Sequence, residues 1–237
     1  MATRNRGKEG SDDRLFGDPK MQSKMREAIK DQSYLLSRGF SEKSSLVLVG
    51  NRYKFNNRQQ RAVQGMSEAT HKLTKRTENC LQPNELAEKE VYIDGFNVLI
   101  MLESALSGAY LFKGLDGCYR DLSSVHGTYK KVTQTETAIH LVAEFLENHQ
   151  IQKTTWIFDK PVSNSGRLKT LLGEIAAAKN YNWEIILDNN PDKLIAESNA
   201  IAVSSDAWIL NHAQRWLNLV GHLIEAEDLN SNVILSN

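Results

Sequence analysis

The chain has 237 residues, of which 41% are hydrophobic and 24% are charged, a composition typical of a globular protein. No apolar run approaches the roughly 20 residues that cross a bilayer, and no apolar signal core follows the first residues. These features exclude a membrane protein and favour a cytoplasmic location. Cys80 and Cys118 match no metal-ligand spacing, so we expect two free thiols.

The net charge of zero hides an uneven distribution along the chain. Residues 1–90 contain 18 Lys and Arg against 12 Asp and Glu, whereas residues 91–237 contain 11 against 17. A basic part beside an acidic part fits a phosphate-binding module next to a metal-binding one. It fits equally well two halves that attract each other.

The first third of the chain predicts helices. Residues 1–19 are polar with little periodicity, so we expect a disordered tail there. Ser41 and Asn56 are suitable N-terminal caps. Apolar residues at helical spacing predict three helices, over 20–37, 42–49 and 58–75. We therefore expect a small, basic helical domain over 20–80 and a polar linker over 81–90.

One stretch of the helical part, residues 52–61, mixes cations with aromatic residues. This composition suits phosphate contact and base stacking. The alternative, which we favour, is that the aromatic rings pack in a small core and the cations are simply solvated. The candidate RNA-binding residues are Arg52, Lys54, Arg58 and Arg61.

From residue 91 onward the pattern alternates between strands and helices. Strands are predicted over 91–94, 154–158, 183–187, 200–204 and 219–224. Helices are predicted from a Thr133–Glu136 capping box, after Ser163, over 191–197 and over 207–216. The glycine-rich segment 101–131 fits no regular element. This alternation predicts a three-layer α/β/α domain over 91–227, with a mostly parallel sheet.

Four of the apolar runs end at an aspartate, namely Asp94, Asp159, Asp188 and Asp206. Parallel strands bring their carboxyl ends to one edge of the sheet, where such folds bind ligands. Carboxylates gathered there repel one another unless a cation joins them, which predicts a Mg²⁺ or Mn²⁺ site. The alternative is that each aspartate only caps the helix that follows it.

Several classes of enzyme with this fold are excluded by their motifs. A haloacid-dehalogenase phosphatase needs a second aspartate where Phe96 stands. A receiver domain normally has an acidic pair before its phosphorylated strand and a lysine on its last strand, and neither is evident. Gly-rich nucleotide loops and a Gly-x-Ser-x-Gly elbow are also missing.

The stretch Ile93-Asp94-Gly95-Phe96-Asn97-Val98 resembles the first strand of PIN-like nuclease domains, in particular their NYN branch. The likeness continues at 157–159, 191–192 and 203–206. Over about residues 20–225 the chain resembles the family named domain of unknown function 434, in which a helical part precedes such a domain. Glu103 to Gly108, Asp116 to Asp121 and Phe158 to Gly166 look like stretches of that family.

The resemblance to PIN-like nucleases implies roles for particular residues. Asp94 and Asp206 would bind the metal, with Asp159 and Asp192 completing the acidic set. Asn97 would orient Asp94 or touch the scissile phosphate. A neighbouring phosphate would be held at a helix N-terminus by Ser163, Ser165 and Arg167.

Five further residues are accessory candidates. Asp188 shares a loop with Asp192 and could be only a cap. The segment 101–131 adds Asp116, Arg120, Asp121 and His126, which the general nuclease pattern does not supply. They could enlarge the site, or Arg120 and Asp121 could pair to fix the loop, which we favour.

The leading hypothesis from the sequence is a Mg²⁺- or Mn²⁺-dependent ribonuclease whose helical part assists RNA binding. The first alternative is a PIN-like protein that binds RNA or a nucleotide without cleaving it. The second is a hydrolase of small phosphoesters. The substrate could equally be a nucleic acid other than RNA. The sequence does not give the oligomeric state, and a homodimer is one option.

Overall fold

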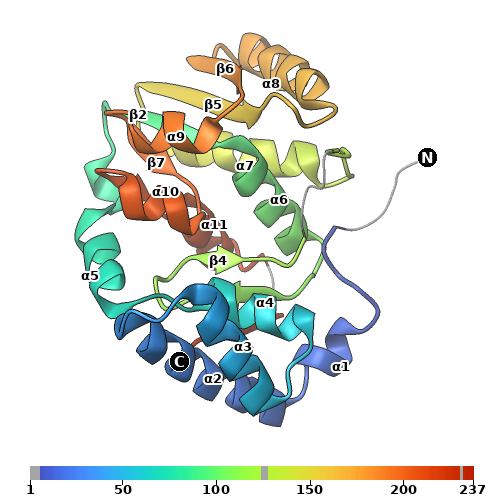
Figure 1. The fold of residues 1–237 in the computed structure, drawn as a ribbon. Helices are drawn as coiled ribbons and strands as arrows, with labels where there is room; N and C mark the ends of the chain where they lie inside the picture. Colours follow the sequence, from blue (N-terminus) through green and yellow to red (C-terminus); the bar gives the residue numbers. More distant parts are fainter. Residues whose placement is uncertain (1–5, 124–127, 230–231) are drawn as a thin grey trace.

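A computed structural model describes residues 6–123, 128–229 and 232–237 of the chain. Its centre is a six-stranded sheet with the order β1-β8-β7-β2-β5-β6, in which every pair of neighbours is parallel (Figure 1). The predicted parallel sheet is therefore confirmed. The strands are β1 (Cys80–Leu81), β2 (Glu90–Asp94), β5 (Lys153–Asp159), β6 (Trp183–Asp188), β7 (Ile201–Val203) and β8 (Trp216–Leu217).

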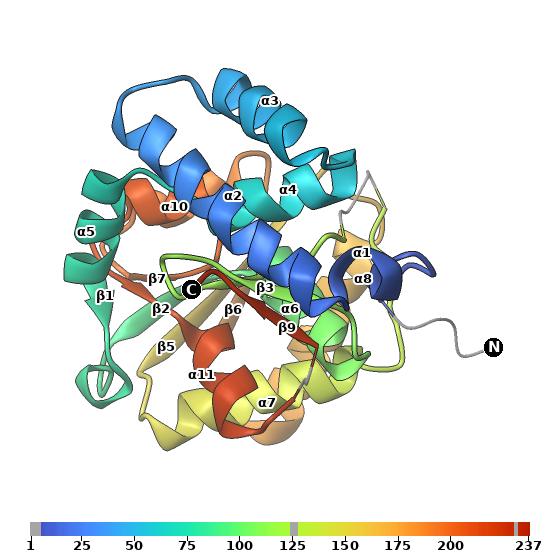
Figure 2. The ribbon, with the colours of Figure 1, turned by 90° about the horizontal axis from the view of Figure 1, so that it is seen from below.

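Helices cover both faces of this sheet, as predicted. Side chains alternate along each strand, so Ile93 and Trp156 pack against one layer while Tyr92 and Ile157 pack against the other. Figure 2 shows α7 and α11 on one side of the strands and α10 on the other. The first layer contains α6 (Gly95–Leu106), α7 (Thr135–Asn148), α8 (Ser165–Lys179) and α11 (Leu219–Ala226). The second contains α9 (Pro191–Ala196) and α10 (Ala207–His212).

The N-terminal part is helical, and two of its predicted caps are present. The Ser41 hydroxyl accepts a hydrogen bond from the backbone N–H of Ser44 at 3.2 Å, and Asn56 forms a capping box with Gln59. The helix predicted over 58–75 is two separate helices, because the backbone is extended at Ser67. The elements are α1 (Asp12–Phe16), α2 (Pro19–Ser37), α3 (Glu42–Tyr53), α4 (Asn57–Met66) and α5 (Thr70–Asn79).

The expected disordered tail over 1–19 is wrong for the described residues 6–18. Phe16 is fully buried and its ring meets Phe112 edge-on, with centroids 4.9 Å apart. Arg58 anchors the same segment through a two-pronged contact with Asp12, at 2.6 and 2.9 Å. One aromatic anchor and one buried ion pair are enough to order a segment whose average composition is polar.

The helical part does not have a core of its own. A smaller sheet, β4-β3-β9, packs against it, and Tyr110, Phe112 and Ile234 complete its apolar cluster. These strands are β3 (Leu111–Lys113), β4 (Tyr119–Arg120) and β9 (Val233–Leu235). The domain boundaries expected at 20–80, 81–90 and 91–227 therefore separate segments that share packing, and the irregular segment 101–131 contains part of α6 and two strands.

Two local predictions near the ends of elements are wrong. The strand expected over 219–224 is α11, which Asn218 caps by accepting from the N–H of Gly221 at 3.1 Å. Its apolar residues Leu219, Val220, Leu223 and Ile224 are buried at helical spacing, but an apolar run this short cannot be told from a buried strand by its pattern alone. The predicted Thr133–Glu136 box is replaced by a helix that begins at Thr135. Within the described residues, no helix is long and apolar enough to span a membrane.

Candidate functional site

The strand order places a crevice between β2 and β7. From β2 the chain continues to β5 on one side, whereas β7 lies on the other side of β2. Helices α6 and α10 follow these two neighbouring strands on opposite faces of the sheet. This is the topological switch point at which open α/β sheets bind their ligands. Asp94 and Asp206 each precede the first residue of one of these helices.

Asp94 ends β2 and is only 9% exposed. One carboxylate oxygen accepts the N–H of Asn97 at 3.3 Å, which caps α6, and the other accepts the Ser204 hydroxyl at 2.8 Å. The glycine that follows is required by space: a Cβ on Gly95 would lie 2.1 Å from the Phe158 ring. Packing of β5 against the start of α6 therefore explains the glycine of the Asp-Gly-Phe-Asn motif.

The Asn97 side chain connects α6 to the loop that follows β7. Its side-chain carbonyl accepts both the N–H and the hydroxyl of Ser205, at 2.9 and 3.0 Å. The hydroxyl of Ser204 in turn accepts the N–H of Asp206 at 3.0 Å. The Asn97 side chain therefore holds the loop that carries Asp206, while its backbone bonds to Asp94.

Asp206 caps α10. Its Oδ1 atom accepts the backbone N–H groups of Trp208 and Ile209, at 2.8 and 3.2 Å. Within the described part of the chain, its Oδ2 atom accepts no hydrogen bond. Asp94 and Asp206 are thus helix caps, as the simpler interpretation of the sequence expects, and they also lie at the switch point.

The carboxylates of the sheet edge influence one another. Burial raises the pKa of Asp94 to about 7, and the charges of Asp192 and Asp206 add to this effect. Burial, together with the charges of Asp206 and Asp159, raises the pKa of Asp192. Burial also raises the pKa of Asp159. Asp94, Asp192 and Asp206 therefore lie within electrostatic reach of one another, and Asp159 lies within reach of Asp192.

The geometry limits which metal these carboxylates could bind. Among the described residues, no group of three His, Cys, Asp or Glu side chains is placed to hold one ion. Mg²⁺ commonly takes one or two carboxylates and keeps several water molecules, so its coordination does not require such a group. The arrangement does not suit Zn²⁺, whose structural sites use four protein ligands.

Residues expected around this cluster have mainly local contacts. Asp188 accepts the N–H of Asn190 at 2.7 Å, which stabilises the turn before α9. Ser165 is buried at the start of α8, and the Ser163 carbonyl accepts the N–H of Tyr129 at 3.1 Å. Arg167 is exposed. Of the three predicted phosphate-binding side chains, those of Ser163 and Arg167 are therefore at the surface.

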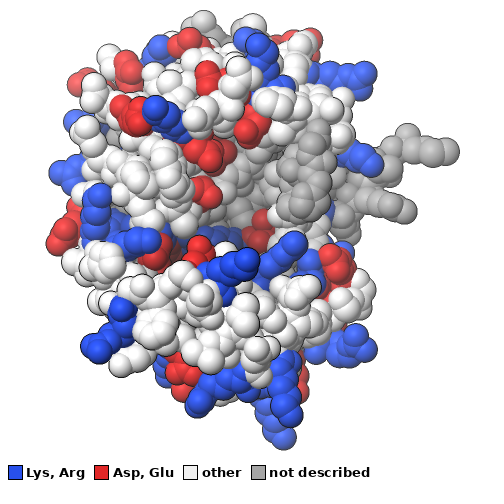
Figure 3. Space-filling model, in the orientation of Figure 1, with Lys and Arg blue, Asp and Glu red and all other residues white. Residues whose placement is uncertain are grey.

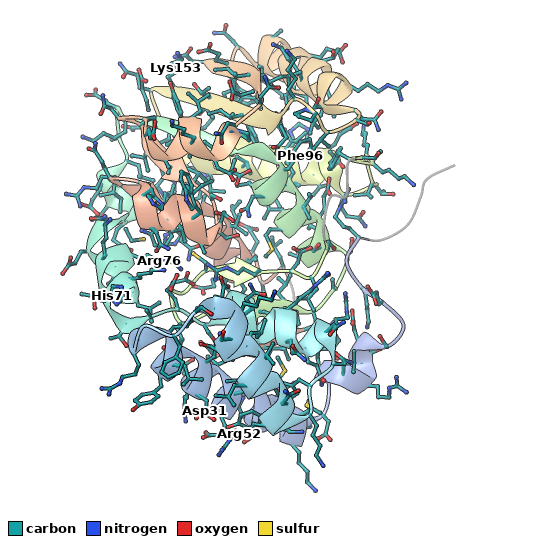
Figure 4. All side chains as sticks on the ribbon, viewed as in Figure 1. Asp31, Arg52, His71, Arg76, Phe96 and Lys153 are labelled. Atoms are coloured by element: carbon teal, nitrogen blue, oxygen red, sulfur yellow. The ribbon has the colours of Figure 1, made fainter. Side chains whose placement is uncertain are left out.

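A cleft of about 850 Å³ separates the helical part from the α/β part and reaches the sheet edge. Figure 3 shows this hollow across the face of the molecule, with Lys and Arg side chains along its lower margin. Figure 4 shows His71 and Arg76 on the α5 side, and Phe96 at the start of α6. The lining also includes Phe40, Arg61, Lys72, Asn97, Arg120, Asp206 and Trp208.

Arg120 pairs with Asp116, so the favoured pairing with Asp121 is wrong. Two nitrogens of Arg120 donate to the two Asp116 oxygens, at 2.9 and 2.6 Å, and Arg76 donates to Asp116 at 2.5 Å. Although burial opposes ionisation, these guanidiniums lower the pKa of Asp116 to about 2. Asp121 instead accepts the Ser104 hydroxyl at 2.9 Å. His126 lies outside the described residues.

The predicted RNA-binding stretch is mostly engaged elsewhere. Arg58 binds Asp12 and Glu9, and Arg52 pairs with Asp31 at 3.3 Å, far from the cleft in Figure 4. Lys54 ends α3 with a left-handed backbone. Of the four candidates, Arg61 is the one that lines the cleft. His71, Lys72 and Trp208 also line it, and no motif in the sequence indicated them.

Strand order and sheet-edge carboxylates define a doubly wound α/β protein with a polar crevice at its switch point. Residues 83–222 match the model of a domain of unknown function, DUF5616, and residues 24–78 match that of a protein of unknown function, DUF434. The chain therefore belongs to the DUF5616 family. An uncharacterized protein of Methanocaldococcus jannaschii is 31% identical over 201 residues, which cover 84% of this chain and 95% of that protein. No solved structure matches the chain.

Proposed function

We propose that this protein is a Mg²⁺- or Mn²⁺-dependent hydrolase of RNA phosphodiesters, of the PIN-like class. One observation carries the proposal: Asp94 is buried at the sheet edge, its pKa is raised by burial and by the charges of Asp192 and Asp206, and Asp206 lines a cleft that cations also line. A buried carboxylate that faces further carboxylates is stabilised in its charged form when a cation binds beside it.

Each residue of the site would have a separate role. Asp94 and Asp206 would hold the metal, and Asp192 with Asp159 would complete its surroundings through water. When bound, the metal would lower the pKa of a water molecule and neutralise charge on the phosphodiester. Asn97 would keep the Asp206 loop in register through its two hydrogen bonds to Ser205.

Arg120 is the best candidate for a direct phosphate contact. Arg120 lines the cleft, and although burial opposes its charge, Asp116 raises its pKa, with a smaller contribution from Asp206. Asp116 fixes the orientation of the guanidinium from behind through two hydrogen bonds. An arginine held in this way is suited to bind a phosphate in a defined geometry.

The cleft favours a polymer over a small phosphoester. It measures about 850 Å³, and Arg61, Lys72 and Arg120 are distributed along it. Several cations along one cleft suit the repeated charges of a nucleic-acid backbone. One observation favours the non-catalytic alternative: Asp94 already uses both of its oxygens for hydrogen bonds within the protein.

The test is cleavage of a mixed RNA pool in Mn²⁺ by wild type, Asp94→Asn and Asp206→Asn. Asparagine keeps the shape and the capping ability of aspartate but removes its charge, so each variant isolates the metal-binding role. We expect cleavage to fall about a hundred-fold or more in both, in line with the loss of one charge-stabilising group. Asp188→Asn is the matched control and should cleave normally, because Asp188 only stabilises a turn.

Equal cleavage by wild type and both variants would contradict the proposal. Turnover of mononucleotides without cleavage of any polynucleotide would establish the small-molecule alternative. RNA binding without cleavage in either metal would establish the non-catalytic one.

A further inference from the structure

An exposed tryptophan lies beside the acidic cluster. Trp208 is 43% exposed and lines the cleft, although large apolar side chains are usually buried. It is the second residue of α10, and its backbone N–H bonds to Asp206 at 2.8 Å. The indole stacks on His212, with ring centroids 4.2 Å apart and planes 26° apart. This contact holds the indole from one side and leaves it partly open to the cleft.

The helical part supplies other groups to the same cleft. Phe40, in the turn between α2 and α3, is 55% exposed. Arg61 and Lys72 line the cleft from α4 and α5, and Lys72 has one weak partner, Glu68, at 3.4 Å. His71 precedes Lys72 on α5 (Figure 4). Aromatic faces and cations therefore occur together in the cleft that contains Asp206.

We propose that Trp208 is a stacking platform for an unpaired base, and that Arg61 and Lys72 contact the phosphates of the same strand. A flat ring with one face against the protein and the other toward solvent is the arrangement on which single-stranded nucleic acids stack. In a duplex both faces of each base are covered by neighbouring bases, so the platform selects single-stranded segments. The inference rests on the proposed function, because it places RNA in this cleft.

The experiment measures binding of a short, mixed-sequence single-stranded oligoribonucleotide by fluorescence anisotropy, without added divalent metal. The full chain is compared with Trp208→Leu, Trp208→Phe and Tyr34→Leu. Tyr34 is the matched control, because it is an aromatic residue that is 64% exposed but lies outside the cleft. The same RNA annealed to its complement, and a version whose bases are replaced by abasic sites, serve as comparison ligands.

We expect Trp208→Leu to weaken binding of the single strand about ten-fold, the typical effect of removing one stacking ring. Trp208→Phe should recover most of this loss, and Tyr34→Leu should bind like wild type. The abasic strand should bind wild type and Trp208→Leu equally, because it has no base to stack. Duplex RNA should bind more weakly than the single strand.

The inference is overturned if Trp208→Leu binds as tightly as wild type, or if the duplex binds as tightly as the single strand. A parallel cleavage assay in Mn²⁺ separates this result from the proposed function. Cleavage that is insensitive to Trp208 would overturn the platform and leave the nuclease. Trp208-dependent binding without cleavage would overturn the nuclease and support the platform, and no binding to any strand would overturn both.

Discussion

Asp94 combines two roles that the sequence presented as alternatives. It caps α6 through the N–H of Asn97, and it is the most deeply buried member of the acidic cluster. A cap does not require burial, since most capping residues lie at the surface. Its low exposure and its hydrogen bond from Ser204 therefore need a second reason, and the proposed metal provides one.

The raised pKa of Asp94 predicts how stability depends on pH. Because burial raises its pKa from 3.8 to about 7 in the folded protein, the folded state binds this proton more tightly than the unfolded state. The resulting stabilisation is complete below pH 4 and is lost as the pH rises through 7. Relative to Asp94→Asn, wild type in EDTA should lose up to about 4 kcal/mol of unfolding free energy between pH 4 and 8.

Urea unfolding of both proteins across this range measures the difference. If the difference between the two unfolding free energies does not change with pH, ionisation of Asp94 does not destabilise the folded state. Added Mn²⁺ should recover part of the loss at pH 8 in wild type, since a ligand that binds only the folded state stabilises it.

Single residues of the site were predictable where local sequence determines their place. Asp94, Asp159 and Asp206 follow apolar strands, so their common edge could be inferred from strand direction. The partners of Arg58 and Arg120 could not be predicted. Asp12 is 46 residues from Arg58, and Asp121 is nearer to Arg120 in the sequence than its actual partner Asp116. Trp208 carried no signal, because a tryptophan in a short helix is normally part of the core.

At the scale of elements, a buried arginine connects α5 to α10. Arg76 is 2% exposed and donates to Glu68 and Asp116 at 2.5 Å, and to the Asn211 side chain at 2.9 Å. It also donates to the carbonyl of Ala207 at 3.2 Å. Because α10 begins directly after Asp206, the guanidinium fixes the helix that presents this carboxylate.

Replacing Arg76 with methionine should therefore destabilise the protein strongly. The side chain would keep its apolar volume, but Glu68 would lose its strongest partner in a buried setting. A cost of about 3–5 kcal/mol is expected, as for other broken buried ion pairs. Lys75→Met is the control: Lys75 is exposed and donates once, to the Asn211 carbonyl at 2.9 Å, so its loss should cost about 0.5 kcal/mol or less.

Urea unfolding measures both free energies. If both variants lose a similarly small amount of unfolding free energy, the hydrogen bonds of Arg76 do not connect α5 to α10. Elements themselves were predictable where periodicity is clear, as in α2 and β5. They were not predictable where a short apolar run fits a strand as well as a helix, as in α11, or where an average polar composition conceals one buried aromatic residue, as in α1 with Phe16.

At the scale of the whole molecule, both explanations of the uneven charge have support. Arg76 of the basic part binds Asp116 of the acidic part, so the two parts do attract each other. Arg61 and Lys72 nevertheless line the cleft between them. The fold class followed from strand–helix alternation alone. The cleft could not be predicted, because it depends on how the helical part docks through Tyr110, Phe112 and Ile234.

Calorimetric titration with Mn²⁺ at pH 8 tests the central claim most directly, on wild type, Asp94→Asn and Asp188→Asn. We predict binding to wild type and Asp188→Asn and none to Asp94→Asn. Binding should weaken at pH 6, because the metal must then displace the proton that Asp94 holds with a pKa of about 7. Absence of binding to wild type at metal concentrations on the order of millimolar, or equal binding to Asp94→Asn, would contradict the account.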